Sequence, residues 1–307
     1  MTRDFFLKRK RGFLLLAGLV LVLMLILIGI TYKGPNLGIE DVVGLMTKKL
    51  EILSRMRIHL LKSVEAEKMA VMADTDESSN AFADQAEKAT RFVDQDRREL
   101  DLLIRKDPTG QETKFLQEFD QCFREFREID QGLLEFAVLN TNLKAARLSF
   151  GQGQEVLKRF EEALDHFMGA DLFDREEIQC ASLASKALTA ALKIHYLHGP
   201  HIAETGDEQM DKIEAEIKKN QGAVNQFLKA MRPLVPIGKQ ADLKDAEKAF
   251  DVFSRITARV ITLSRQNTNI KSFELSLGRK RKITAQCDEI LISLEEAVRG
   301  RSFKATR

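Results

Sequence analysis

Hydrophobic residues along most of the chain recur three or four positions apart, the spacing that places side chains on one face of an α-helix. One such stripe runs through Ile129, Leu133, Phe136, Asn140 and Leu143, in alternating steps of four and three residues. These steps are typical of helices that pack in bundles. The pattern therefore predicts an all-α protein made of long, bundled helices.

One segment near the amino terminus is apolar on every side of such a helix. Residues 13–32 read FLLLAGLVLVLMLILIGITY and include no charged side chain. Twenty helical residues rise about 30 Å, the thickness of the hydrocarbon core of a bilayer. A cleavable signal peptide has a shorter apolar region that ends at a small-x-small site, and neither feature occurs here. We therefore expect an uncleaved transmembrane helix.

The charges beside this segment predict its orientation. Four consecutive basic residues at 8–11 precede it, whereas residues 34–43 beyond it are slightly acidic. Because positive charge favours the cytoplasmic side, we expect residues 1–12 to form a cytoplasmic basic tail and the rest of the chain to lie outside. The three cysteines are too few, and odd in number, to imply a disulfide framework. Free thiols are unusual in an oxidising compartment and count against this orientation.

Helix-breaking residues beyond the apolar segment gather at a few points. Turns are predicted at 107–110, 198–200 and 233–238, because proline cannot continue a helix and glycine disfavours one. Asp174 and Glu177 have the spacing of a capping box that starts a helix. The intervening segments predict helices at 38–76, 79–106, 111–168, 174–198, 205–231 and 239–298.

The chain repeats itself at an offset of 127 residues. Residues 123–151 and 250–278 share ten identical residues over 29 ungapped positions, which indicates an internal duplication. Each copy contains three predicted helices, and its long third helix can pack against its own partners and against those of the other copy. The predicted fold is an elongated tandem helical bundle of two three-helix units, at 36–170 and 171–300, followed by a basic tail at 301–307.

Two asparagines, Asn140 and Asn267, lie on otherwise apolar stripes at equivalent places in the repeat. One interpretation is that they set the register of packed helices, as a single buried Asn does in coiled coils. The other is a polar layer that binds a small polar or anionic ligand, because a lysine four residues after each Asn shares its face. The candidate ligand-binding residues are Asn140, Asn142, Lys144, Asn267, Asn269 and Lys271.

Three of the five histidines form an H-x-x-H-x-x-H pattern at His195, His198 and His201. Imidazoles three residues apart share a helix face and can ligate Zn²⁺, Cu²⁺ or Ni²⁺. The alternative is a polar turn at the end of a bundle, because a break at 198–200 would place His201 outside the helix. No cofactor is otherwise expected.

A second basic run, Arg279, Lys280, Arg281 and Lys282, begins a basic carboxyl-terminal region. It is either a solvated helix face or a contact for anionic lipid headgroups or an acidic ligand. Residues 1–33 carry a net charge of +5 and the rest of the chain −3, so nucleic-acid binding is not expected. The sequence has no nucleophile elbow, phosphate loop, glycine fingerprint or metalloprotease motif, and we expect no enzyme.

The order of these features resembles the sensory region of bacterial methyl-accepting chemotaxis receptors. A basic amino terminus, the apolar segment at 13–32 and a long helix with LLKSVEAEKMAVMAD at 60–74 are followed by charged helical hairpins. The doubled unit is similar to the stacked, bimodular version of these four-helix-bundle ligand-binding domains. The resemblance implies a single-pass protein of a bacterial inner membrane with its bulk in the periplasm. Such receptors continue into a second membrane helix and a signalling coiled coil, which this sequence does not include.

We therefore expect a membrane-anchored, extracytoplasmic sensory or ligand-binding module that acts through self-association or a separate signalling partner. Its expected partners are the lipid bilayer, further copies of the chain in a homodimer or larger helical assembly, and a small ligand. The alternative is a structural protein that organises or shapes membranes with long helices and a basic end. That alternative needs basic residues aligned on one face, whereas a sensor needs a polar pocket between helices.

Overall fold

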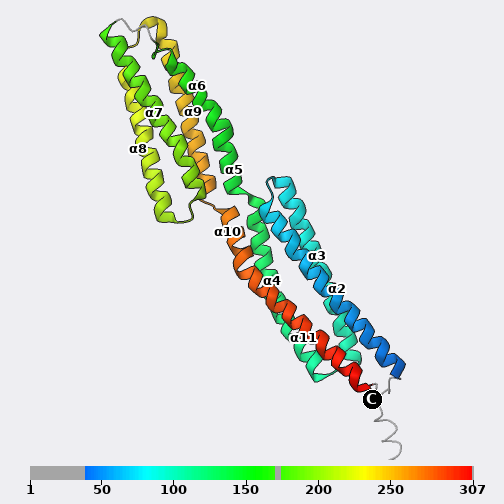
Figure 1. Cartoon of the computed structure of the whole chain (residues 1–307). Coiled ribbons are helices and arrows are strands. Elements are labelled where there is room, and N and C mark those ends of the chain that lie inside the picture. Colours follow the sequence, from blue (N-terminus) through cyan, green and yellow to red (C-terminus); the bar gives the residue numbers. More distant parts are fainter. Residues whose placement is uncertain (1–38, 170–173, 306–307) are drawn as a thin grey trace, which may run out of the picture. The chain divides into compact units, whose positions relative to one another are not determined.

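A computed structural model describes residues 39–169 and 174–305 of the chain (Figure 1). Nearly all of these residues are helical, which confirms the expected all-α fold. The expected cytoplasmic tail at 1–12 and transmembrane helix at 13–32 lie outside the described residues. Among the helices that the structure describes, none combines the length and the apolar character needed to cross a bilayer.

Contacts divide the chain into two compact units. The terminal unit joins the start of α2 (Ile39–Met72), as far as Glu51, with the end of α11 (Arg281–Ala305) from Glu295 onward. The central unit comprises residues 52–294. The two described segments nearest the ends of the chain therefore belong to one unit, although the whole central unit separates them in sequence.

Four helical segments of the central unit form what we call the first bundle (Figure 1). Three of them are α2 from Ile52, α3 (Asp76–Lys106) and α4 (Gly110–Leu139). The fourth returns from the far end of the sequence as α10 (Thr268–Leu275), the π-helical turn η3 (Ser276–Lys280) and α11, and it packs on α4. The apolar core of this bundle includes Met56, Leu60, Leu100, Phe119, Phe126, Leu133 and Leu291.

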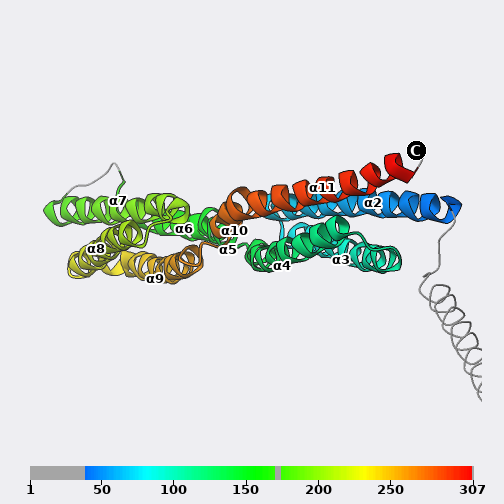
Figure 2. The ribbon, with the colours of Figure 1, turned by 90° about the horizontal axis from the view of Figure 1, so that it is seen from below.

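The remaining helices of the central unit form the second bundle. One segment continues the chain beyond α4 as α5 (Thr141–Leu148), the π-helical turn η1 (Ser149–Gly153) and α6 (Gln154–Asp165). It packs against α7 (Arg175–Ala203) and α9 (Gln240–Ser264), which follows a short 3₁₀ turn, η2 (Ile237–Lys239). The helix α8 (Asp207–Met231) packs along α7 (Figure 2). The core includes Phe160, Leu164, Ala187, Ile194, Ile217, Val224, Phe250 and Phe253.

Each copy of the sequence repeat contributes to both bundles. The first copy supplies α2, α3 and α4 to the first bundle, and α5 and α6 to the second. The second copy supplies α7, α8 and α9 to the second bundle, and α10 and α11 to the first. The two π-helical turns, η1 and η3, begin at equivalent positions of the repeat, Ser149 and Ser276.

Local signals in the sequence explain where several helices begin and end. The expected turns at 107–110 and 233–238 are found between α3 and α4 and between α8 and α9. The predicted cap at Asp174 is confirmed, since its side chain accepts a hydrogen bond of 2.7 Å from the backbone N–H of Glu177 at the start of α7. Such a cap satisfies a backbone donor that has no partner within the helix.

Two expectations about helix breaks are wrong. The break predicted at 198–200 does not form, because α7 continues through Pro200 to Ala203. A proline inside a helix removes one backbone hydrogen bond, and here the hydrogen-bonded side chains of His198 and His201 hold the last turn. The third helices predicted at 111–168 and 239–298 are not continuous, because the backbone is left-handed at Asn140 and Asn267.

Two of the three cysteines are paired, although their number implied no disulfide framework. Cys122 of α4 and Cys287 of α11 form a disulfide with their Cα atoms 5.7 Å apart. Within the described ranges the remaining cysteine, Cys180, is a buried free thiol. The disulfide fastens the returning segment of the first bundle to α4.

Candidate functional site

The chain crosses between the two bundles at the residues where the third helices break. Asn140 and Asn267 have φ angles of 49° and 51°. Asn140 lies between α4 and α5, and Asn267 directly precedes α10, three residues after the end of α9 at Ser264. Left-handed backbone is costly for most residues, and asparagine adopts it more readily than most because its short polar side chain can hydrogen-bond locally. The two asparagines therefore make equivalent breaks in the two copies of the repeat.

The residues that follow these breaks hydrogen-bond to each other. The backbone N–H of Thr141 donates to Thr268 Oγ1 at 3.1 Å, and the backbone N–H of Thr268 donates to Thr141 Oγ1 at 3.2 Å. Both threonines are buried. Exchange of identical bonds between equivalent residues means that the crossover has an internal two-fold relation.

Side-chain amides extend the same relation. Asn142 Nδ2 donates to Asn267 Oδ1 at 2.8 Å, and the equivalent Asn269 Nδ2 donates to Asn140 Oδ1 at 2.9 Å. Asn269 Oδ1 also accepts from the backbone N–H of Asn142 at 3.1 Å. The four asparagines proposed as ligand-binding residues are thus brought together, and most of their hydrogen-bonding capacity is used within the protein.

The two lysines of the proposed ligand layer also have partners within the chain. Lys144 Nζ lies 3.0 Å from Asp76 Oδ2 and donates to the carbonyl of Leu139. Its ammonium, together with the amide of Asn140, holds the pKa of Asp76 below the ordinary value. Lys271 Nζ lies 5.8 Å from the ring centre of Phe136. The register-setting interpretation accounts for all of these contacts, and the ligand interpretation of the layer stays a prediction.

His198 lies in the core of the second bundle and both of its ring nitrogens are engaged. Nδ1 is 2.9 Å from Ser149 Oγ and Nε2 is 3.1 Å from Thr257 Oγ1. Burial, reinforced by the neighbouring His195 and His201, lowers the pKa of His198 to about 4. This histidine is therefore neutral at physiological pH.

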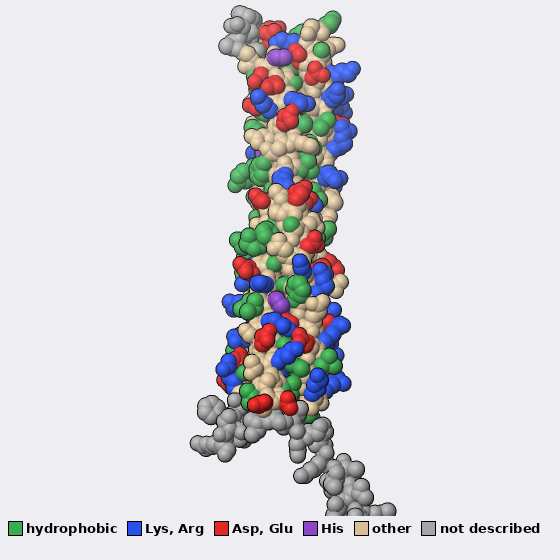
Figure 3. Space-filling model, turned by 90° about the vertical axis from the view of Figure 1, so that its right-hand side faces the viewer, with side chains coloured by type: hydrophobic (Ala, Val, Ile, Leu, Met, Phe, Trp, Pro, Cys, Tyr) green, Lys and Arg blue, Asp and Glu red, His purple; other side chains and the backbone are tan. Residues whose placement is uncertain are grey.

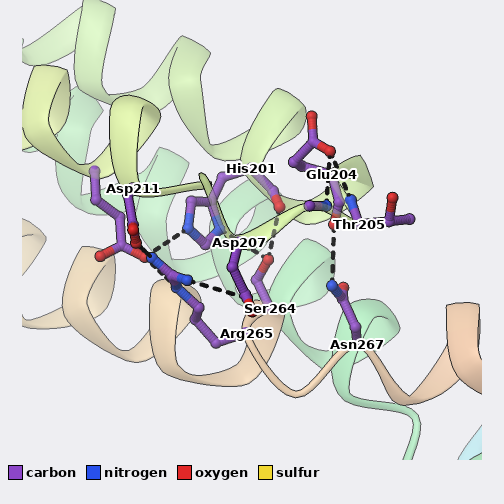
Figure 4. A network of polar contacts seen from close by, with 10 residues as sticks. His201, Glu204, Thr205, Asp207, Asp211, Ser264, Arg265 and Asn267 are labelled. Atoms are coloured by element: carbon purple, nitrogen blue, oxygen red, sulfur yellow. Dashed lines mark hydrogen bonds and ion pairs between the residues drawn. The ribbon is translucent and has the colours of Figure 1, made fainter. Parts of the chain in front are cut away.

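His201 belongs to a different network at the end of α7 (Figure 4). Its Nε2 lies 2.9 Å from Glu214 Oε1, which also accepts a hydrogen bond of 2.6 Å from Arg265 Nε. Burial opposes ionisation of Glu214, but hydrogen bonds from Arg265 and His201 lower its pKa. Arg265 pairs in addition with Asp207 and Asp211.

These contacts do not build the proposed metal site. The third member, His195, directs Nε2 to the backbone carbonyl of Ser149 at 3.2 Å. In the described part of the chain no group of three or more His, Cys, Asp or Glu side chains could hold a metal ion. Each of the three rings faces its own hydrogen-bond partners, so the metal interpretation of the histidines stays a prediction that these contacts do not support.

The basic run at 279–282 is not one solvated face. Arg279, Arg281 and Lys282 are exposed, but Lys280 is only 1 % exposed and pairs with Asp130 of α4. The π-helical turn ends at Lys280. Three of the four side chains are exposed, with Arg279 3.9 Å from Glu125, and the fourth is part of the core.

A buried group of charged residues, which sequence reasoning missed, surrounds Lys280. Asp130 of α4 is 4 % exposed and Glu67 of α2 is fully buried. Asp130 occupies the position that Thr257 holds in the second copy. A carboxylate on an apolar stripe, at a position where the two copies differ, was the sequence feature that could have indicated this buried group.

The first bundle also carries a groove of about 630 Å³ between α3 and α4. Its lining includes Arg91, Arg124 and Arg127 together with carboxylates and the buried Asp130. Arg91 pairs with Glu87, whereas Arg124 and Arg127 make no ion pair or hydrogen bond within the described residues. A smaller groove of about 430 Å³ is lined by the same two arginines. Two arginines without carboxylate partners can bind a carboxylate or phosphate through paired N–H groups.

Comparison of the chain with protein-family models, curated proteins and solved structures gives no match.

Proposed function

We propose that the chain is a membrane-anchored, extracytoplasmic sensory module of the chemoreceptor type. The observation that carries this proposal is the terminal unit, in which the described start of α2 and the end of α11 come together. The apolar segment at 13–32 precedes α2 in the sequence. Movement of α11 against α2 within the terminal unit would therefore act on the part of the chain that directly follows the proposed anchor.

The arrangement of the repeat supports a sensory role. Two three-helix units share two bundles, and the segment of α10, η3 and α11 runs from the crossover through the first bundle. Helices that slide or rotate by one to two ångströms are a common way for packed helical proteins to transmit a binding event. The module would act through self-association or a separate signalling partner.

The disulfide supports the proposed compartment. Disulfides persist in the periplasm and outside cells and are rare in the cytosol. Free thiols counted against an extracytoplasmic orientation. Because Cys122 and Cys287 form a disulfide, that argument no longer applies to them. We propose that the bulk of the chain lies in the periplasm of a bacterium and that the amino-terminal end of the anchor faces the cytoplasm.

We place the ligand in the groove between α3 and α4. The alternative, the asparagine layer at the crossover, satisfies most of its polar groups internally. In the groove, the guanidinium groups of Arg124 and Arg127 have no ion-pair partner among the described residues, and carboxylates such as Glu128 and Glu135 lie nearby. This combination suits a small polar ligand that has at least one carboxylate.

The membrane-shaping alternative has less support. A scaffold would present aligned basic residues, but Lys280 points into the core. On the face shown in Figure 3, Lys and Arg side chains are interspersed with Asp and Glu. Such a mixed surface has no continuous band of positive charge to draw onto an anionic membrane.

The proposal can be tested with the full chain in lipid nanodiscs. Thermal unfolding is followed against a panel of amino acids, di- and tricarboxylates and divalent metals. A ligand present at 100 times its dissociation constant should stabilise the folded state by about 2.7 kcal/mol. Arg127→Gln should weaken the binding at least tenfold, since a charge-assisted hydrogen bond contributes about 1.5–3 kcal/mol.

Two further measurements separate the outcomes. The matched control Arg259→Gln changes an exposed arginine of the second bundle and should leave the affinity unchanged. If no compound shifts the unfolding temperature and the protein instead deforms liposomes, the scaffold is correct. A reporter enzyme fused to the carboxyl end tests the compartment, and cytoplasmic activity of that reporter would refute the sensory proposal.

A further inference from the structure

Three ionisable side chains meet in the core of the first bundle, each from a different helical segment. Glu67 belongs to α2, Asp130 to α4 and Lys280 to η3. Their exposed fractions are 0 %, 4 % and 1 %. Charged groups are rarely buried to this extent, because transfer out of water costs several kcal/mol per ion unless the charge is compensated.

Asp130 and Lys280 compensate each other. Lys280 Nζ donates to Asp130 Oδ1 and lies 3.2 Å from the ring centre of Phe126, a favourable position for a cation. The other carboxylate oxygen, Oδ2, is 3.4 Å from the Thr90 hydroxyl of α3, which in turn bonds to Ser63 of α2. These two residues form a satisfied buried ion pair.

Glu67 is the uncompensated member of the group. Within the described residues, neither of its carboxylate oxygens makes a hydrogen bond of standard geometry, although the hydroxyl of Ser276 lies close enough to favour the ionised form. Burial raises the pKa of Glu67, and only partly opposing effects come from Ser276 and Lys280 of η3 and from Lys68 of α2. Asp130 of α4 adds to the rise. One buried ammonium faces two buried carboxylates, so the group is one positive charge short of balance unless it binds a proton.

The second bundle shows that the fold does not require these charges. The positions equivalent to Glu67, Asp130 and Lys280 are Ile194, Thr257 and Gly153. The π-helical turn forms in both copies, and in the second bundle the neutral His198 bridges Ser149 and Thr257. The equivalent place in the second bundle is therefore filled by apolar and neutral residues. Because the fold forms without charges there, the three charged residues of the first bundle call for a separate explanation.

We propose that Glu67, Asp130 and Lys280 form a proton-binding site that couples pH to the position of α11; that this is the pH outside the membrane rests on the proposed function. When Glu67 releases its proton to water, its new carboxylate competes with Asp130 for the ammonium of Lys280. Lys280 is the last residue of η3 and directly precedes α11. Movement of the Lys280 side chain from Asp130 of α4 towards Glu67 of α2 therefore changes how the segment of α10, η3 and α11 packs in the first bundle. The site needs no ligand in the α3–α4 groove.

Infrared spectroscopy of the full chain as a function of pH, without added ligand, tests whether Glu67 is protonated. The wild type should show the carbonyl band of a protonated carboxylic acid that persists to a pH above the range of the other carboxylates. Glu67→Gln should lack this band. Glu67→Ile is a second variant that should also lack the band. It introduces the residue found at the equivalent position of the second bundle, Ile194, which packs in the core there. If the wild type has no such band, or if Glu67→Gln keeps it, the proposal is wrong.

The coupling to α11 is tested by hydrogen exchange of residues 276–294, with the equivalent residues 149–167 as the internal reference at each pH. Exchange in the wild type should rise relative to the reference at least threefold as the carboxylic band disappears. Glu67→Gln and Glu67→Ile should remove that rise, while His198→Gln in the second bundle should leave it in place. Equal exchange in wild type and both Glu67 variants would refute the coupling. Neither result depends on whether the groove binds a ligand.

Discussion

Thr141 and Thr268 each accept a hydrogen bond from the backbone N–H of the other, although 127 residues separate them. Their hydroxyl oxygens also lie 3.2 Å apart. The helices they begin, α5 and α10, enter different bundles. In the described part of the chain, this pair therefore joins the two points at which the chain passes between the bundles.

Replacing either threonine should destabilise the protein. Thr141→Val keeps the shape but leaves the buried N–H of Thr268 without its acceptor, which costs about 1–3 kcal/mol. The double variant Thr141→Val, Thr268→Val should cost less than the sum of the single variants, because both lose the same network. Urea denaturation of the three variants measures this coupling. Thr262→Val on the exposed face of α9 is the control, and strictly additive effects would contradict the reciprocal arrangement.

The left-handed backbone at Asn267 predicts an unusual order of substitutions. Glycine adopts this conformation without penalty, whereas alanine does so at a cost of about 1–2 kcal/mol. Asn267→Ala should therefore be less stable than Asn267→Gly by about 1 kcal/mol, although both lose the same side-chain hydrogen bonds. At Ser254, inside α9, alanine should be the more stable of the two. The same order at both positions would show that Asn267 is not left-handed.

His198 predicts a loss of stability in mild acid. Its pKa in the folded protein is about 4, below the value of 6.5 for the unfolded chain, so the unfolded state takes up the proton first. The associated stability is complete above pH 6.5 and is lost as the pH falls towards about 4, by about 3 kcal/mol in total. Denaturation at a series of pH values should show this slope in the wild type. A slope of the same size in His198→Gln would contradict the assignment.

The disulfide predicts a response to reductant. Cys122 and Cys287 close a loop in which the sequence separation is 165 residues, and a native disulfide typically contributes about 2–4 kcal/mol. Dithiothreitol should lower the midpoint of chemical denaturation of the wild type. It should have no effect on the double variant Cys122→Ala, Cys287→Ala, which keeps Cys180. An unchanged midpoint of the wild type after complete reduction would show that the bond does not stabilise the fold.

Substitution of Lys280 should destabilise the protein strongly, whereas substitution of its neighbour Arg279 should hardly change stability. Lys280→Met leaves Asp130 buried without its cation and should cost about 3–5 kcal/mol. Adding Asp130→Asn should restore part of that stability, because the uncompensated charge is removed. Arg279→Met, at an exposed site, should change stability by less than about 0.5 kcal/mol. Similar effects of Arg279→Met and Lys280→Met would contradict the buried position of Lys280.

Helical spacing and capping residues were enough to predict the all-α fold and several helix ends. Ile129 and Leu133 of the alternating stripe are buried as expected, and the cap at Asp174 forms. These features depend on residues close in sequence, which periodicity and local hydrogen bonding describe well.

The features that sequence reasoning missed depend on contacts between distant residues. Asn140 lies on the stripe at a position that a continuous helix would also fill, so its left-handed backbone was not visible in the spacing. Lys280 was grouped with exposed neighbours because the π-helical turn that ends at this residue alters the helical phase. The pairing of Cys122 with Cys287 required knowledge of which helix returns to α4.

The exchange of third helices between the bundles limits how the chain can be divided. A fragment that carries only the first copy of the repeat would have three helices of one bundle and a single helix of the other. The apolar faces of these helices would be exposed until another molecule supplied the missing partners. Separately produced halves should therefore recover the native structure only by complementation, when each completes the other in trans.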